Sequence, residues 1–418
     1  MTKKSVLVVG AGMLQKWIMQ EAKNLGLCVI ATDSNPCAVA RDSADEFYVL
    51  NTYDIEGHCI LVRDLMRMHA LQGVVCCGND VAPTVAAAAA VAGTPGIPLE
   101  VAQRTHNKHA VRFTLFTNGL QSYQPCWEIC ARDEDIKNWE YYAAQIGYPL
   151  VLKPLTQRAS RGVSLVATAD DLAPALTKLL AFEGDFGLIE ERLTGTEHSV
   201  EGIFDTDGSP VWFNIVDRFF DYTGGVPIET GHVNPSVLPE SDQDAIFTML
   251  GEVAQALGVT WGPFKADVML TADGPKILEV TARLSGGFDS QGTSPLTGRH
   301  PMRAVLQLAC GMPVEAPLTW TPTQGYAACA AILVQRSGRV VCMPNRYEAM
   351  LWLENERMHP GPHIEDIVWT MSEGQPIHPA MHNGERAGFV LAQASTYDEA
   401  WQLAKRAANA LAAAVEVA

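Results

Sequence analysis

The chain has 418 residues, a length that suggests two or three domains. Hydrophobic residues make up 48% of the chain and charged residues 18%, a composition that excludes extensive disorder and fibrous repeats. The formal net charge of −17 disfavours general nucleic-acid binding, because a field of that sign repels phosphate backbones. No uninterrupted apolar run in the sequence reaches the roughly 18 residues needed to cross a bilayer.

The cysteine pattern and the first apolar stretch predict the cellular compartment of the protein. Ten cysteines are scattered without a Cys-x-x-Cys pair, which is typical of buried thiols in a reducing environment. The first apolar stretch is interrupted by Gly10, Gly12 and Gln15, so a strand followed by a turn fits it better than a signal peptide. We therefore expect an acidic, soluble, cytoplasmic protein with neither nucleic acid nor a membrane as partner.

The first predicted element is a βαβ unit. Residues 5–9 form a short apolar strand, a Gly-x-Gly turn and a helical pattern follow, and residues 27–31 read as a second buried strand that ends at Asp33. This order calls for a parallel sheet. A dinucleotide site with Asp33 on a ribose is one interpretation, although Gln15 stands where that fingerprint has its third glycine. An NAD(P)-dependent oxidoreductase therefore stays open as an alternative.

The segment after this unit is more specific. Asp-Ser-Asn-Pro at residues 33–36 is followed by Gly-Asn-Asp at residues 78–80 and by an alanine-rich helix over residues 81–92. This succession resembles the N-terminal domain that precedes the nucleotide-binding region of ATP-grasp enzymes. The resemblance implies a Rossmann-like shape that binds no dinucleotide and whose loops help to hold the acceptor substrate.

Basic residues mark the start of the central region. Lys108 opens a predicted helix and Arg112 lies on the same face, where solvated surface positions are the alternative reading for both. The apolar strand over residues 150–152 leads into Lys153, whose burial is costly unless its ammonium meets an anion. The loop over residues 155–162 is polar, small and basic, and such a loop can place backbone amides and cations on phosphates.

The next strand carries acidic residues at fixed spacing. Residues 187–189 deliver Ile-Glu-Glu-x-Leu-x-Gly-x-Glu, which ends at Glu197. Together with the Lys-Pro strand end and the basic loop, this order resembles the nucleotide cleft of the ATP-grasp superfamily. The resemblance implies phosphate contacts from two lysines, an adenine edge read by the backbone after the strand, and a ribose held by Glu197. The implied ATP-binding residues are Lys108, Lys153, Ser160, Arg161, Glu190, Glu191, Leu193 and Glu197.

A predicted hairpin brings two further acids together. Asp267 and Glu279 lie at similar distances from an Asp-Gly turn at residues 273–274, so both can project on one face. Two converging carboxylates repel each other unless a divalent cation joins them, and Mg²⁺ or Mn²⁺ on ATP phosphates meets that need. The superfamily has Glu-x-Asn-x-Arg in this segment, and here Thr281 replaces the asparagine as a weaker expected metal ligand. A structural hairpin with incidental acids is the alternative.

The same segment continues into Arg283 and Leu-Ser-Gly-Gly at residues 284–287. The forked guanidinium suits a carboxylate or a transferring phosphoryl group, and the glycines let backbone amides approach a developing oxyanion. We predict Arg283, Lys153, Ser285 and Gly286 as catalytic residues. The segment lacks the signatures expected of biotin carboxylases and of one purine-pathway carboxylase.

Glu229 and His232 form a Glu-x-x-His step between these blocks. In carboxylate–amine ligases that couple amino acids, such a step faces the arginine of a Glu-x-x-x-Arg segment, a spacing that residues 279–283 keep. The chain thus resembles the L-amino acid ligase, or dipeptide synthetase, branch over residues 5–310, and the remainder more loosely. The implied substrate-binding residues are Glu229, His232, Arg283, Gly287 and Phe288, with Glu229 expected on a substrate ammonium group.

We expect an α/β and α+β chain with the ATP-grasp fold in three domains. A Rossmann-like domain with a parallel sheet covers residues 1–106, and the ATP-grasp domain covers residues 107–318, with a lid subdomain at about residues 125–192. A proline-rich linker then leads to a small β-rich C-terminal domain over residues 319–418. Its strands and its final helix, capped by a Thr-x-x-Glu box at residues 396–399, carry no readable chemistry, and its histidines lack metal-ligand spacing.

These observations predict an ATP-grasp ligase with small-molecule substrates. A carboxylate would attack the γ-phosphorus of ATP to give an acyl phosphate and ADP, and an amine would then displace phosphate to form an amide. We expect amino acids or similar zwitterions as substrates and a homodimer as the assembly. Besides the oxidoreductase, a catalytically silent nucleotide-binding subunit is an alternative, because Thr281 stands at a metal-ligand position.

Overall fold

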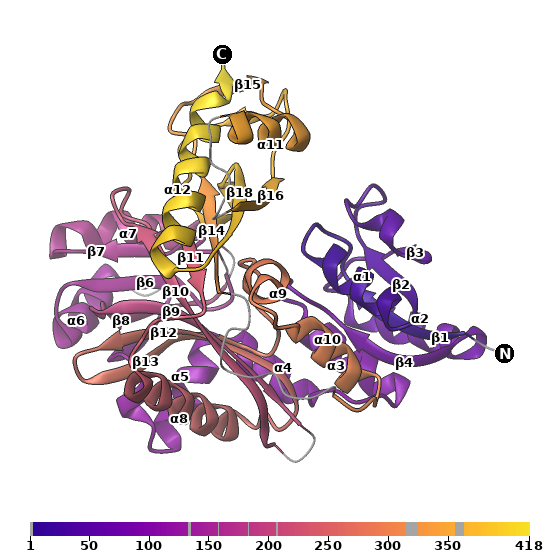
Figure 1. Ribbon diagram of the computed structural model, residues 1–418. Helices are drawn as coiled ribbons and strands as arrows, with labels where there is room; N and C mark the ends of the chain where they lie inside the picture. The colour runs from indigo at the N-terminus through magenta and orange to yellow at the C-terminus, as the bar shows by residue number, and fades with distance from the viewer. Residues whose placement is uncertain are drawn as a thin grey trace.

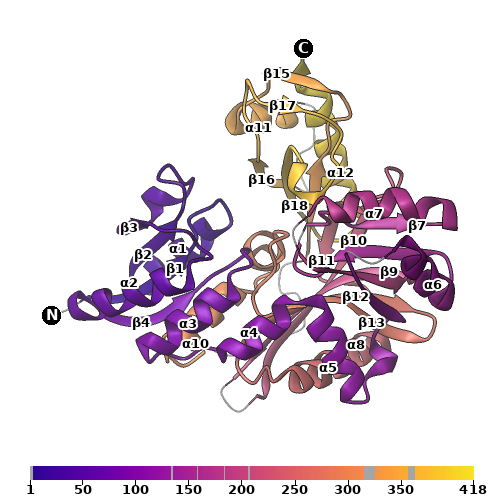
Figure 2. The ribbon, with the colours of Figure 1, turned by 180° about the vertical axis from the view of Figure 1, so that it is seen from behind.

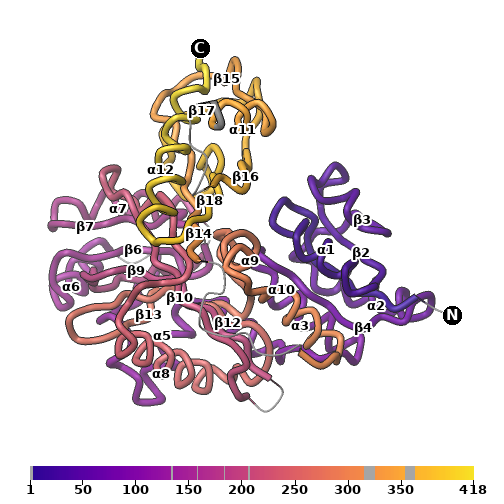
Figure 3. Tube along the Cα trace, viewed as in Figure 1, coloured from indigo at the N-terminus to yellow at the C-terminus, as the bar shows by residue number. Residues whose placement is uncertain are grey.

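The computed structural model describes residues 3–132, 135–157, 159–182, 184–205, 208–314, 325–355 and 363–418. An N-terminal unit, a large central unit and a C-terminal unit lie around a common centre (Figure 1, and from behind in Figure 2). The N-terminus lies at the outer edge of the first unit and the C-terminus at the far tip of the last, as the trace in Figure 3 shows.

The N-terminal unit is built on a four-stranded sheet in the order β3-β2-β1-β4, with every neighbouring pair parallel. Helices on both faces explain why its strands read as continuous apolar runs. The parallel sheet expected from the βαβ pattern is confirmed. Its elements are β1 (Lys4–Val9), α1 (Gln15–Asn24), β2 (Cys28–Asp33), β3 (Glu46–Val49), α2 (Ile55–Met68), β4 (Ala70–Val75), α3 (Ala82–Ala92) and α4 (Leu99–His106).

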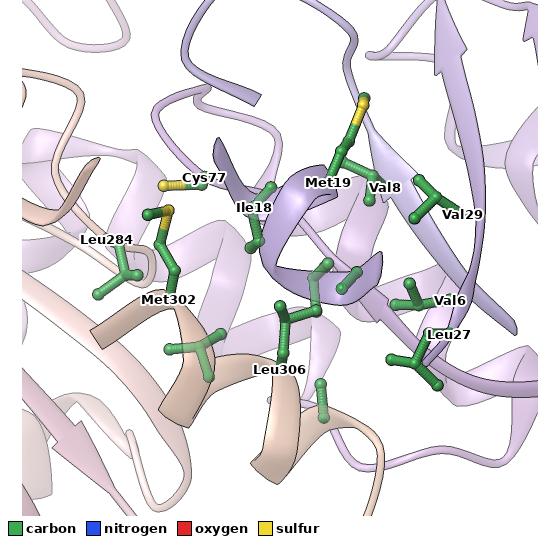
Figure 4. Close-up of a cluster of buried hydrophobic side chains, with 14 of the residues drawn as sticks. Val6, Val8, Ile18, Met19, Leu27, Val29, Cys77, Leu284, Met302 and Leu306 are labelled. Carbon is green, nitrogen blue, oxygen red and sulfur yellow. The ribbon is translucent and has the colours of Figure 1, made fainter. Parts of the chain in front are cut away.

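A helix from much later in the chain completes the core of this unit. Helix α10 (Pro301–Ala309) packs against α1 and β4. Met302 and Leu306 contribute to the same buried cluster as Val6 and Ile18, as the close-up in Figure 4 shows. Because Leu284 also belongs to this cluster, the segment between Leu284 and α10 is fixed to the N-terminal unit at both ends.

The lid subdomain is an antiparallel sheet in the order β5-β8-β6-β7, covered by α6 and α7. Thr168 and Asp171 form a reciprocal capping box before α7. The lid elements are β5 (Trp127–Ala131), α6 (Ile136–Ile146), β6 (Leu150–Pro154), β7 (Ser164–Val166), α7 (Leu172–Leu180) and β8 (Phe186–Glu191).

The central unit contains an eight-stranded sheet in the order β13-β12-β9-β10-β11-β14-β18-β16. Helices α5 and α8 pack on its strands through a cluster that includes Leu115, Met249 and Phe264. Helix α8 begins at Glu240, directly after Pro239. The elements are α5 (Lys108–Thr117), β9 (Thr196–Phe204), β10 (Pro210–Asp221), β11 (Ile228–Asn234), α8 (Glu240–Leu257), β12 (Gly262–Thr271), β13 (Gly274–Thr281) and α9 (Ser294–Leu296).

The C-terminal unit shares that sheet, because β14 pairs with β11. The domain boundary predicted at residues 318–319 lies outside the described residues, as do His359 and most of the proline-rich stretch. Thr396 caps the last helix as predicted. The elements are β14 (Tyr326–Ile332), β15 (Gly338–Cys342), α11 (Arg346–Asn355), β16 (His363–Trp369), β17 (Pro376–Ile377), β18 (Gly388–Ala394), α12 (Tyr397–Ala414) and β19 (Glu416–Val417).

Across the described residues, no helix combines the length and the apolar character that a membrane crossing requires.

Candidate active site

A cleft of about 560 Å³ lies where the lid, the central sheet and loops from both terminal units meet. Fifteen of the predicted site residues line it, and three others do not: Arg161, His232 and Phe288. The predicted residues that line the cleft are Lys108, Lys153, Ser160, Glu190, Glu191, Leu193, Glu197, Glu229, Asp267, Glu279, Thr281, Arg283, Ser285, Gly286 and Gly287.

The buried ammonium group of Lys153 is paired with a carboxylate of the protein itself. Its ammonium pairs with one oxygen of Glu190, while the other oxygen accepts a hydrogen bond from Arg112 Nε at 2.6 Å. Burial lowers the pKa of Lys153 despite the attraction of Glu190. Burial raises the pKa of Glu190, but Arg112 and Lys153 together bring it below its usual value. The reading of Arg112 as a surface residue is wrong, since its side chain is buried.

This buried network makes Arg112 a stability determinant. We expect Arg112→Met to lower the free energy of unfolding by about 3–5 kcal/mol, because it leaves a buried carboxylate with one cation fewer. Urea unfolding followed by circular dichroism measures this change. Arg63→Met, at an exposed position of α2, is the control and should stay within about 0.5 kcal/mol of the unmodified protein. Equal stability of both variants would contradict the role of Arg112.

Lys108 connects the lid loop to the central hairpin. Its ammonium donates to the Gln157 carbonyl at 2.7 Å and lies 2.9 Å from Glu279 Oε1. The loop itself is held in an unusual conformation, because Ala159 and Ser160 both have positive φ values, of 56° and 63°. Arg161 in that loop is exposed, and Arg158 lies outside the described residues.

The nucleotide strand β8 is paired on both sides, with β5 and with β6. Glu190 stands opposite Trp127 and Val151, so its own backbone belongs to the sheet. The strand ends at Glu191, and Leu193 lines the cleft just beyond it. Backbone groups available to a base therefore begin after the strand rather than at Glu190.

The acidic hairpin has the predicted geometry. Asp267 on β12 stands directly opposite Glu279 on β13, and Thr281 stands opposite Lys265. Asp267 Oδ1 accepts a hydrogen bond from Arg218 Nη1 at 2.7 Å and also pairs with Lys265. Burial raises the pKa of Asp267, but these two cations bring it below its usual value.

No cluster of three or more His, Cys, Asp or Glu side chains arranged to hold a metal occurs in the described ranges. The site nevertheless fits Mg²⁺, which proteins commonly bind through one or two carboxylates together with substrate phosphates. Asp267 and Glu279 supply that pair, and Thr281 lies two residues further along β13, on the same face as Glu279.

Arg218 on β10 is a site residue that the sequence analysis missed. It donates to both oxygens of Glu229 at 3.0 Å and to Glu197 at 2.9 Å, in addition to Asp267. Burial lowers the pKa of Arg218, but the three carboxylates raise it well above its usual value. Burial also raises the pKa of Glu197 to about 7, although Arg218 opposes this. Arg218 therefore stays charged and holds three acids in one place.

Glu229 lines the cleft but differs from the expected ammonium site. Besides Arg218, its Oε2 lies 3.5 Å from Nη1 of Arg386 in the C-terminal unit. Burial raises the pKa of Glu229, but Arg218 and Arg386 bring it down to about 2. Both carboxylate oxygens thus face guanidinium groups. In this structure the guanidinium groups of Arg218 and Arg386 bind Glu229, where an ammonium group of the substrate was expected.

The C-terminal unit also contributes Asn383, a second missed residue. Its side chain accepts a hydrogen bond from the Glu229 amide at 2.8 Å and donates to Ser160 Oγ at 3.0 Å. Its own amide donates to the Ala159 carbonyl at 3.0 Å. The turn that carries Asn383 therefore joins the lid loop to β11 across the cleft.

Arg283 is held by the N-terminal unit. Its Nε and Nη2 lie 2.8 Å and 2.7 Å from Asp80 Oδ1, and its Nη1 donates to the Leu284 carbonyl. A Cβ atom on Gly286 would lie 3.3 Å from the Gly78 carbonyl, so this backbone approach favours glycine. Two nitrogens of the Arg283 guanidinium, which was expected to bind a substrate, therefore contact Asp80.

Phe288 and His232 support the cleft wall from behind, contrary to the expected direct contacts. Phe288 packs against Trp17 and Phe389, with ring centroids 5.8 Å and 4.7 Å apart. His232 Nε2 lies 3.3 Å from Thr293 Oγ1. Burial lowers the pKa of His232 even though acidic groups are near. His232 is therefore neutral near pH 7.

Two backbone amides of the N-terminal glycine turn already donate hydrogen bonds to nearby side chains. The Ala11 amide donates to Asp33 Oδ2 and the Gly12 amide to Gln15 Oε1, each at 2.9 Å. A dinucleotide fingerprint needs such amides and its acidic residue for the ligand. This geometry therefore disfavours the oxidoreductase alternative.

Comparisons with known proteins agree with this geometry. A family model described as an ATP-grasp domain matches residues 146–291. The central part of the chain thus matches an ATP-grasp domain. A second model, described as L-amino acid ligase C-terminal domain 2, matches residues 354–416, so the similarity extends into the C-terminal unit. ATP-grasp enzymes use ATP together with Mg²⁺, and one solved neighbour holds ADP with magnesium.

Individual relatives cover the chain to different extents. Dapdiamide A synthase of Enterobacter agglomerans is 27% identical over 46% of this chain and 45% of its own length. D-alanine–D-alanine ligase of Aromatoleum aromaticum is 30% identical over 42% of this chain and 55% of its own. The chain spans about half the length of the curated relatives it matches. The crystal structure of L-amino acid ligase from Bacillus licheniformis covers 97% of both chains with a TM-score of 0.77 and 22% identity, which confirms the fold.

Proposed function

We propose that this chain is an ATP-dependent carboxylate–amine ligase that forms a peptide-type bond on amino acids or similar zwitterions. The observation that carries the proposal is that one cleft is lined by two chemically different sets of residues. One set is the opposed pair Asp267 and Glu279 with Lys108 and Lys153, and the other is the Arg283 segment. The similarity to L-amino acid ligases in both matched regions supports the same substrate class.

The acidic pair and the two lysines are suited to ATP. Lys108 and Lys153 would contact phosphate oxygens, and the residues after β8 would contact the base. Asp267 and Glu279, with Thr281 beside them, would hold Mg²⁺, which when bound neutralises charge on the phosphates. Arg218 lies among three of the cleft acids and is placed to add positive charge near the transferred group. Most of the catalytic effect would come from positioning and electrostatics, as is usual in phosphoryl transfer.

The Arg283 segment is suited to a carboxylate followed by an amine. A carboxylate oxygen attacks the γ-phosphorus, the bond to ADP breaks, and an acyl phosphate forms. The amine nitrogen then attacks the acyl carbon, and phosphate leaves with the bonding electron pair. Arg283 and the backbone around Gly286 line the cleft and would stabilise the oxyanion of the tetrahedral intermediate. The homodimer stays a prediction, which sedimentation of the purified protein tests.

Isotope transfer tests the acyl-phosphate route. A phosphate-release screen of amino-acid pairs identifies a productive pair, and the carboxylate donor of that pair is then labelled with ¹⁸O. Because the attacking oxygen stays with the phosphoryl group, we expect one ¹⁸O atom in each released phosphate, measured by mass spectrometry. Unlabelled phosphate would exclude the acyl phosphate. ATP binding without ADP release for any pair would instead favour the silent subunit.

A further inference from the structure

One buried carboxylate of the cleft has an oxygen without a hydrogen-bond partner in the described part of the chain. Asp289 lines the cleft, yet only 2% of its surface is exposed. It opens the π-helical turn Asp289–Thr293, directly after Phe288, whose φ of 73° is a strained value for a bulky residue. Within the described residues, Asp289 Oδ2 has no hydrogen-bond partner. A polar atom buried without a partner costs free energy, so a missing ligand group is the natural explanation.

The other acids of the cleft differ from Asp289. Six of them form an ion pair with an arginine or a lysine of the protein, and Glu191 accepts a hydrogen bond from the Cys126 amide. Asp289 lacks such a partner in the described part of the chain. The six paired acids are Asp80, Glu190, Glu197, Glu229, Asp267 and Glu279.

The groups that face Asp289 increase its need for a cation. His232 Nε2 lies 3.7 Å from Asp289 Oδ1, but burial lowers the pKa of His232 and so disfavours its charged form. Burial raises the pKa of the Cys329 thiol well above its usual value, so that group is neutral. The third neighbour, Glu201 on β9, is acidic. No fixed positive charge among these three neighbours offsets Asp289.

Glu201 and Asp289 form a buried acidic pair. Glu201 Oε1 accepts hydrogen bonds from the Ser285 amide, at 2.7 Å, and from the Ser290 hydroxyl, whereas its Oε2 has no partner among the described residues. Burial, followed by the charge of Asp289, raises the pKa of Glu201 to about 7. Glu201 therefore holds a proton more readily than an isolated carboxyl group does.

Access to Asp289 from the cleft depends on Gly287. A Cβ atom at Gly287 would lie 3.0 Å from Asp289 Oδ1, so any side chain there would occupy the space in front of the carboxylate. Gly287 lies between Asp289 and the Ser285-Gly286 backbone expected to face the reacting carbonyl. An amine held at Asp289 would therefore be next to the acyl group it attacks.

We propose that Asp289, supported by Glu201, binds the ammonium group of the amine substrate and accepts one of its protons. This inference rests on the proposed ligase function and adds the general base of its second half. An ammonium group has no lone pair, so it must lose a proton before it can attack the acyl carbon.

The proton balance of the step is complete. The ammonium gives one proton to the Asp289 carboxylate, and the neutral amine attacks the acyl phosphate. The amide bond forms while the bond between the acyl carbon and the phosphate oxygen breaks. The second proton of the nitrogen leaves with the phosphate as hydrogen phosphate, and the proton on Asp289 passes to water after product release.

Asp289→Asn separates the two half-reactions. With the amino-acid amine, we expect turnover to fall by about 10²- to 10⁴-fold, the usual contribution of a general base. With hydroxylamine as the amine, hydroxamate formation should stay within a few-fold of the unmodified enzyme, because its nitrogen is largely unprotonated at neutral pH. Unchanged turnover with both amines, or equal loss with both in a folded protein, would overturn the proposal. If the unmodified enzyme forms no hydroxamate with any amino acid, the ligase function itself fails.

Two further measurements keep the test decisive. Asp289→Ala should regain amine transfer when formate is added, because a free carboxylate can occupy the vacated space, and no rescue would contradict the base role. Glycinamide, which carries an ammonium but no carboxylate, should raise the thermal unfolding temperature of the unmodified protein with MgADP but not that of Asp289→Asn. No shift in the unmodified protein would overturn the ammonium site even without turnover. Asp273→Asn, at an exposed turn position, is the matched control and should behave as the unmodified protein.

Discussion

Glu279→Gln is expected to leave the protein folded and to reduce ADP formation almost to background. The amide keeps the shape of the side chain and can still accept a hydrogen bond from Lys108, which lies 2.9 Å from Glu279 Oε1. It removes one of the two opposed carboxylates that fit Mg²⁺. Asp267→Asn on the facing strand should have the same effect. Coupled ADP-release assays measure both variants, with circular dichroism as the check on folding.

Controls separate the metal from the ion pair with Lys108. Thr281→Asn should be tolerated or mildly activating, because it restores the usual amide ligand at that position. Excess Mn²⁺ should recover part of the Glu279→Gln activity if metal binding is the defect. MgADP should also raise the unfolding temperature of this variant less than that of the unmodified protein. Ordinary turnover by a folded Glu279→Gln protein would refute the assignment.

Local geometry explains why the opposed pair of acids could be predicted from the sequence. Asp267 and Glu279 are joined by a tight turn, so counting residues from the turn is enough to place them opposite each other. Short-range patterns likewise predicted the cap at Thr396 and the parallel N-terminal sheet. In each case the partners are close in the chain or are fixed by strand connectivity.

The partners that the sequence did not reveal are distant in the chain. Arg386 lies 157 residues after Glu229, and Arg283 lies 203 residues after Asp80. Motif spacing contains no information about which acid such an arginine meets, because that depends on how separate units pack. The role expected for Glu229 therefore changed once its arginine partners were known, and part of the Arg283 guanidinium was found to contact Asp80. Lys265 did offer a local signal, since it lies two residues from Asp267 on the same face of β12.

Burial also decides which predicted residues can touch a ligand. His232 was placed in the pocket through the resemblance of its Glu-x-x-His step, and Phe288 was expected as an apolar wall near Arg283, whereas in the structure both are buried and neither lines the cleft. Asp289, which follows Phe288, lines the cleft instead. Asp289 opens a π-helical turn directly after Phe288, and the sequence analysis did not predict this turn.

Lys153→Met should weaken ATP binding by about ten- to hundredfold, which corresponds to the loss of a charge-assisted contact of roughly 1.5–3 kcal/mol. Methionine keeps most of the side-chain volume and removes the charge, so packing inside the lid changes little. Titration calorimetry with MgATP measures the affinity. NAD should give no thermal shift at concentrations where MgATP clearly does, and stabilisation by NAD would revive the oxidoreductase.

The ion pair between Lys153 and Glu190 complicates this result, and a double variant resolves it. Lys153→Met alone also leaves Glu190 with Arg112 as its remaining cation, so some loss of affinity could come from a disturbed lid. Glu190→Gln in the same chain removes the uncompensated charge. If Lys153 contacts phosphate, the double variant should regain stability to unfolding while its affinity for ATP stays low, because only the first property depends on the pair. Recovery of both would mean that Lys153 acts only as the counter-ion of Glu190.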